Sequence, residues 1–131
     1  LQTETAAVPQ VFEQKKGVVT VIATREVWLR VKAASGTILH EAVMQPGDFY
    51  TVPQTSEPAT IRAGDAGAVY FAANGNTYGP YGARGAVADN LQLTAETLTA
   101  ELSQADWEAI EPLARAVAQI DADGAFGVLS D

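Results

Sequence analysis

The stretch Val27-Trp28-Leu29-Arg30-Val31-Lys32 decides the fold class, because its odd-numbered residues are apolar and its even-numbered residues are large or charged. This period of two is typical of a β-strand that buries one face and exposes the other. Residues 18–23 just before it are almost entirely apolar and β-branched, and Ser35-Gly36 just after it marks a turn into a returning strand. The region therefore predicts paired β-strands.

Turn signals recur along the following residues at the short intervals of a small antiparallel domain. Gln45-Pro46-Gly47-Asp48 fits a type II turn, because proline fixes φ at the second position and glycine supplies a positive φ at the third. Asn74-Gly75 is a strong hairpin signal, since both residues tolerate a positive φ. We therefore expect an all-β domain, a small antiparallel β-sandwich or barrel of about seven or eight strands. The expected strands cover residues 18–23, 27–32, 37–43, 49–52, 60–63, 68–73, 76–79 and 86–93. The expected core contains Val19, Val21, Val27, Leu29, Val31, Val69, Phe71 and Leu91.

Charge divides the chain of 131 residues into unequal parts. Lys and Arg total 8 against 16 Asp and Glu, which gives a net charge of −8. The acids and bases of residues 1–88 cancel, so residues 89–131 hold the whole net charge. We expect a linker over residues 1–17, a β-domain over 18–93 and an acidic helical tail over 94–131. Such a balance makes nucleic acids and anionic membrane surfaces poor partners.

The tail carries helix signals. Thr94 can cap a short helix through Leu102, and Ser103 with Asp106 three residues later fits the start of a second helix. We expect that second helix over residues 104–119, with a kink or break near Glu111 because Pro112 follows, and a frayed end over 121–131. Its apolar face contains Trp107, Ile110, Leu113, Val117 and Ile120. That face should be covered, either by the β-domain or by a partner.

The residue inventory argues against catalysis and metal binding. The chain has no cysteine, and His40 is its one histidine, which reads as an ordinary strand residue because no G-x-S-x-G motif accompanies it. Asp121-Ala122-Asp123-Gly124 resembles the start of a calcium loop, but the residues that follow supply almost no oxygen ligands. The glycines of residues 74–85 match no phosphate-binding pattern and suit turn geometry instead. We therefore expect no enzyme activity, no cofactor and no metal.

The candidate protein-contact residues are Trp28, Arg30 and Lys32 on one strand, with Trp107 in the tail. The strand residues alternate away from the buried set, and tryptophan and arginine are the residue types that most often anchor interfaces. Packing of Trp28 under a loop or under the tail helix is an equal alternative. A second alternative is a periplasmic carbohydrate- or wall-fragment-binding β-module, in which Trp28 and the tyrosines would stack on the ligand.

An ordered series of short motifs runs through residues 18–93. It consists of Trp28-Leu29-Arg30-Val31, Ser35-Gly36-Thr37-Ile38-Leu39, Gln45-Pro46-Gly47-Asp48, Val52-Pro53, Gly64-Asp65-Ala66-Gly67, Asn74-Gly75, Tyr81-Gly82, Gly85 and Val87-Ala88-Asp89-Asn90-Leu91-Gln92-Leu93. In this order and spacing the series resembles the small C-terminal periplasmic domain of RodZ-type cell-shape proteins, which belong to the helix-turn-helix membrane proteins. Family members often have Asp-Gly in place of Ser35-Gly36, and a Gly-Asn-Ala run in place of Gly64-Asp65-Ala66.

The resemblance implies a non-enzymatic contact module for the bacterial wall-elongation machinery. It also implies a bitopic inner-membrane protein, with a cytoplasmic helix-turn-helix domain and a membrane helix upstream of Leu1. The chain begins at Leu1 without a methionine and has no signal peptide and no apolar run near the ~20 residues of a spanning helix, so we expect a fragment or a processed product. The family motif supplies no catalytic residues.

Overall fold

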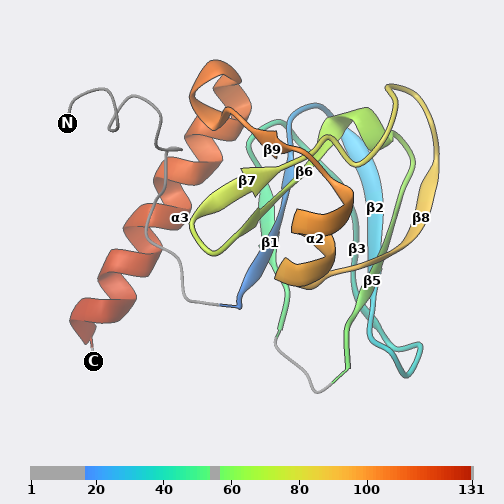
Figure 1. The fold of residues 1–131 in the computed structure, drawn as a ribbon, viewed down its shortest axis with the longest axis horizontal. Helices are drawn as coiled ribbons and strands as arrows, with labels where there is room; N and C mark the ends of the chain where they lie inside the picture. The colour runs from blue at the N-terminus through green and yellow to red at the C-terminus, as the bar shows by residue number, and fades with distance from the viewer. Residues whose placement is uncertain (1–16, 54–56, 131) are drawn as a thin grey trace.

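The computed structural model describes residues 17–53 and 57–130, with the side chains of the last helix described up to Asp121. Residues 1–16 of the expected linker lie outside this part. The described chain forms two antiparallel β-sheets that pack face to face, with a helix against the outer side of one sheet (Figure 1). The five-stranded sheet has the order β4-β1-β6-β7-β9, and the four-stranded sheet has the order β3-β2-β5-β8.

The strands are short, as the spacing of the turn signals predicts. The five-stranded sheet contains β1 (Val19–Ala23), β4 (Phe49–Thr51), β6 (Val69–Ala73), β7 (Asn76–Tyr78) and β9 (Gln104–Ala105). The four-stranded sheet contains β2 (Val27–Lys32), β3 (Ile38–Met44), β5 (Thr60–Ala63) and β8 (Ala88–Gln92). The helical elements are η1 (Ala66–Ala68), α2 (Ala95–Glu101), η2 (Trp107–Ala109) and α3 (Glu111–Ser130). The sandwich prediction is confirmed and no closed barrel forms among the described residues; the described strands number nine because β9 adds one from the tail.

The main core lies between the two sheets. All eight residues predicted for it are buried, and none is more than 6% exposed. Leu98 of α2 is also fully buried there, so the first tail helix covers part of the sandwich. Thr94 caps this helix as predicted, because its Oγ1 accepts a hydrogen bond from the amide of Thr97 at 3.1 Å.

β1 and β2 show which sheet is covered on its outer side. In β2 buried and half-buried residues alternate, which is the pattern of a sheet with one face open to solvent. Every residue of β1 is buried. Val21 contributes to the main core, and Ile22, on the opposite face, belongs to a second core beneath α3. The unbroken apolar run of residues 18–23 thus reflects a strand covered on both faces.

The tail departs from the predicted helix over residues 104–119. Gln104 and Ala105 form β9 and pair with Tyr78 and Thr77 of β7, so they extend a sheet instead of starting a helix. The proposed cap at Ser103 is wrong as well, because its carbonyl accepts a hydrogen bond from the amide of Gly79 at 2.9 Å. A free strand edge on β7 therefore outweighs the local helix signal.

The long helix begins near the expected break and ends later than expected. Asp106 caps the single turn of η2, and α3 starts at Glu111, so Pro112 lies in the first helical turn, where its missing N–H costs nothing. The expected frayed end over residues 121–131 is wrong, because α3 continues to Ser130. Asp131 lies outside the described residues.

α3 packs on the outer face of the five-stranded sheet. The second core unites Leu113, Ala116 and Ile120 of the helix with Ile22 and Ala72 of the sheet. Of the two coverings expected for the tail's apolar face, the chain therefore uses its own β-domain. No helix within the described residues combines the length and apolarity needed to cross a bilayer.

Candidate protein-contact surface

The outer face of the four-stranded sheet brings together three of the four predicted contact residues. Trp28, Arg30 and Lys32 project from β2, which lies between β3 and β5. All three side chains are half-buried, as expected for residues in the middle of an open sheet face. We call these residues and their cross-strand neighbours the open face.

Registers across the strands order the open face into rows. Trp28 lies opposite Val43 of β3, which is 52% exposed. Arg30 lies between Glu41 of β3 and Arg62 of β5. The first row is therefore apolar and the second is charged.

Two of the cations on the open face form no ion pair within the described residues. Arg62 donates a hydrogen bond to Asp89 of β8 at 2.9 Å. Arg30 and Lys32 form no ion pair with another described residue, and the guanidinium of Arg30 lies 5.7 Å from the ring centroid of Trp28. Because a cation over an indole face is held without being neutralised, Arg30 keeps its charge available to a partner.

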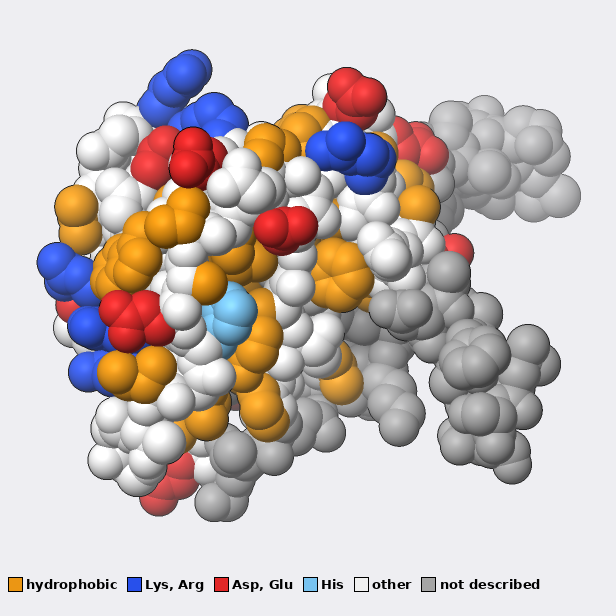
Figure 2. All heavy atoms as spheres, turned by 180° about the vertical axis from the view of Figure 1, so that it is seen from behind, with side chains coloured by type: hydrophobic (Ala, Val, Ile, Leu, Met, Phe, Trp, Pro, Cys, Tyr) orange, Lys and Arg blue, Asp and Glu red, His pale blue; other side chains and the backbone are white. Residues whose placement is uncertain are grey.

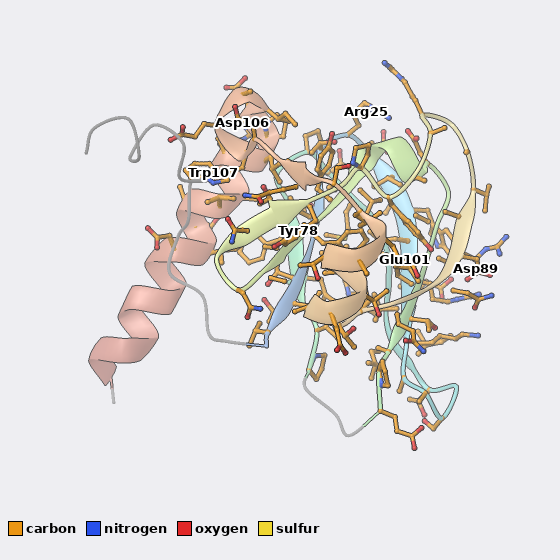
Figure 3. All side chains as sticks on the ribbon, in the orientation of Figure 1. Arg25, Tyr78, Asp89, Glu101, Asp106 and Trp107 are labelled. Carbon is orange, nitrogen blue, oxygen red and sulfur yellow. The ribbon has the colours of Figure 1, made fainter. Side chains whose placement is uncertain are left out.

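Trp107, the fourth predicted contact residue, lies elsewhere. It is half-buried against the second core, beside α3 and β9 (Figure 3). The structure therefore separates it from the open face by the full thickness of the sandwich.

A groove that sequence reasoning missed borders the open face. It runs along the edge of the sandwich, between β3 and β4, and has a volume of about 330 Å³. It is lined by His40, Ala42, Val43, Met44, Gly47, Asp48, Phe49 and Gln119. Figure 2 shows the histidine beside hydrophobic side chains, with Lys and Arg side chains to the left of it and above it. Seven of its eight lining residues fall within residues 40–49, and the groove forms because β3 and β4 pair with β2 and β1 in different sheets.

His40 is held in the groove by an aromatic contact. Its ring stacks on that of Tyr50 with centroids 4.3 Å apart and planes within 13°. Burial raises the pKa of the Tyr50 hydroxyl. This stacked pair gives the groove an aromatic wall.

The polar contacts away from the open face hold loops. Asp65 accepts hydrogen bonds from the amides of Gly85 and Gly67 at 2.7 and 3.2 Å, and it pairs with Arg25 at 2.8 Å. The Gly85 amide, followed by the Arg25 guanidinium, lowers the pKa of the Asp65 carboxyl. Gly67 must be glycine, because a Cβ there would lie 2.6 Å from Cα of Arg84. These contacts fasten the loop before β8 to the turn before β6.

The described residues contain no cluster of three His, Cys, Asp or Glu side chains placed to hold a metal ion. Of the two acids considered for calcium, Asp121 is described and the side chain of Asp123 lies outside the described part. The absence of enzyme activity, cofactor and metal stays a prediction.

Comparison with known proteins gives one family. Residues 20–90, more than half of the chain, match the family model for the RodZ C-terminal domain. No curated protein and no solved structure matches the chain.

Proposed function

Because the chain belongs to the RodZ C-terminal domain family, we propose that it is the non-enzymatic, periplasmic interaction domain of a RodZ-like, bitopic inner-membrane cell-shape protein. Its partner would be a protein of the wall-elongation machinery, and the membrane helix would lie upstream of Leu1.

The observation that carries this proposal is the open face. It presents an indole, two unpaired cations and an exposed valine on a rigid sheet, with the central strand held by neighbours on both sides. Central Trp and Arg residues each contribute about 2 kcal/mol or more at interfaces, whereas isolated exposed residues contribute little. The surface thus has the composition of a protein-binding site.

The carbohydrate-binding alternative finds less support. Tyr81 donates a hydrogen bond to the carbonyl of Ile61 at 3.0 Å and contacts Phe71 edge to face, so its ring packs against the main core. Tyr78 is buried, and Tyr50 is stacked on His40. Trp28 therefore has no neighbouring tyrosine with which to form a sugar-stacking row on the open face.

The experiment is complementation of cell shape by the full-length protein in a strain that lacks it. Arg30→Glu should fail to restore shape, because it reverses the charge that faces the partner. The fold should survive, because a glutamate at this position would be repelled by Glu41 and attracted by Arg62, each by about 0.2–1 kcal/mol. Arg84→Glu, an exposed charge reversal in the loop before β8, is the matched control and should complement normally.

Two results would contradict the proposal. One is normal shape with Arg30→Glu expressed at the level of the natural protein. The other is a topology reporter, fused directly after this domain, that is active only in the cytoplasm.

A further inference from the structure

The four-stranded sheet ends at β3, which pairs with β2 on one side alone. The orientation of its free backbone groups follows from a hydrogen bond in the neighbouring strand pair. The amide of Gly64 donates to the carbonyl of Trp28 at 2.9 Å, so Trp28 and Arg30 direct their backbone groups toward β5. In an antiparallel ladder successive residues point alternately to the two sides, so Leu29 and Val31 point toward β3.

The same alternation applies to β3. Its residues opposite Leu29 and Val31 are Ala42 and His40, and these direct their backbone groups toward β2. Glu41 and Val43 therefore turn an N–H and a C=O each toward the free edge. No hydrogen bond within the described residues occupies these four groups.

The side chains beside this edge differ on its two faces. Glu41 and Val43 lie on the open face and are exposed, and Val43 also borders the groove, while His40, Ala42 and Met44 line the groove from the inner side. Two of the usual protections of an edge strand are missing here, because residues 40–44 contain no proline and no lysine. The register shift between Val31 and Lys32 leaves Leu39 with no residue opposite it in β2, so the regular part of the edge begins at His40.

We propose that β3 is the docking edge for an extended segment of a partner protein, which adds a strand next to Glu41–Val43. The segment would place an apolar side chain opposite Ala42, in the groove, and a lysine or arginine next to it, opposite Glu41. This inference rests on the proposed function and names the kind of segment that the domain receives.

Charge favours such a segment over a second copy of this chain. Glu41 is the one charged residue of β3 and borders the free edge, whereas Arg30 lies opposite it on the inner neighbour β2. The whole chain carries a net charge of −8, so a basic segment at the edge is attracted by Glu41 and also at a distance. Two copies joined at this edge would repel each other, because each chain carries a net charge of −8.

The test uses short synthetic peptides that alternate threonine and valine, with one central threonine changed to lysine or to glutamate. Binding is followed by nuclear magnetic resonance on the full chain, through amide hydrogen exchange. The lysine peptide should slow exchange at Glu41 and Val43, and the glutamate peptide should bind more weakly. N-methylation of the peptide residues that face the edge should abolish binding, because it removes their hydrogen-bond donors.

Variants of the chain give the second readout. Val43→Lys should weaken the lysine peptide at least about tenfold, because an edge lysine opposes strand addition. Glu41→Lys should reverse the preference between the two peptides. Gln92→Lys, an exposed position on β8 at the other edge of the same sheet, is the control and should leave binding unchanged.

Three results would overturn the inference. The first is that about 1 mM lysine peptide does not slow amide exchange at Glu41 and Val43. The binding free energy would then be smaller than about 4 kcal/mol, the value for a Kd of about 1 mM. The second is a dimer in sedimentation that Val43→Lys dissociates, which would make the occupant a second copy. The third is normal cell shape with Val43→Lys while Arg30→Glu fails, which would leave the proposed function standing without this edge.

Discussion

Two fully buried leucines allow the two cores to be compared by the same substitution. Leu29 lies between the sheets and Leu113 lies between α3 and the five-stranded sheet, and both have an exposed fraction of 0%. Leu→Ala in a core costs about 2–5 kcal/mol, and the cost rises with the cavity that remains. The outcome therefore reports how far each site can collapse.

Leu29→Ala should fall in the upper part of that range, at about 3–5 kcal/mol. Its cross-strand neighbours are Ala42 and Ala63, which are too small to fill the space. The two sheets cannot move toward each other at this one position, so the cavity would remain. Leu113→Ala should cost less, about 2–3 kcal/mol, because α3 is bound at one face and can shift toward the sheet. Small domains have a total free energy of unfolding of about 5–15 kcal/mol, so Leu29→Ala should leave the protein partly or wholly unfolded at 37 °C.

Urea denaturation followed by circular dichroism and by fluorescence measures both costs. In a Trp28→Phe background Trp107 alone reports on the helix interface, and in a Trp107→Phe background Trp28 alone reports on the open face. The two fluorescence transitions should coincide if the domain unfolds as one unit. The reasoning is refuted if Leu113→Ala costs as much as Leu29→Ala, or if Leu29→Ala is folded and stable at 37 °C.

Three further perturbations test other parts of the structure. Burial raises the pKa of Tyr81 to about 12. The contribution of Tyr81 to stability should therefore be fully present below pH ~10, its unfolded pKa, and should be lost as the pH rises toward 12. Tyr81→Phe should reduce this loss in melting curves recorded at alkaline pH. The pKa of Asp65 is lowered, so its contribution to stability is present above pH ~4 and is lost as the pH falls through the folded pKa. Asp65→Asn weakens the contact with Arg25 and should cost about 1–3 kcal/mol near neutral pH. The variant should also remove part of the decrease in melting temperature at acid pH. Deletion of residues 106–131 uncovers Ile22 and should increase binding of a hydrophobic dye and promote aggregation, and unchanged solubility of the truncated chain would contradict the role of α3 as a cover.

The sequence by itself determined eight of the nine described strands and the main residues buried between the two sheets. The alternation over Val27–Lys32 and the turns at Gly47 and Asn74-Gly75 are local, because a strand's period and a turn's φ angles depend on neighbouring residues. The same holds for the cap at Thr94 and for the break before Pro112. The shared face of Trp28, Arg30 and Lys32 on β2 was predictable for this reason, since residues that alternate away from a buried set must share the other face.

Tertiary structure alone decided which faces and edges stay free. Gln104 and Ala105 carry a helix signal, yet they become β9 because β7 offers them unpaired backbone groups. The groove beside His40 and the free edge at Glu41 and Val43 exist because β3 and β4 are each the last strand of their sheet. Strand order depends on contacts between residues far apart in the chain, and it cannot be predicted from the periodicity of neighbouring residues.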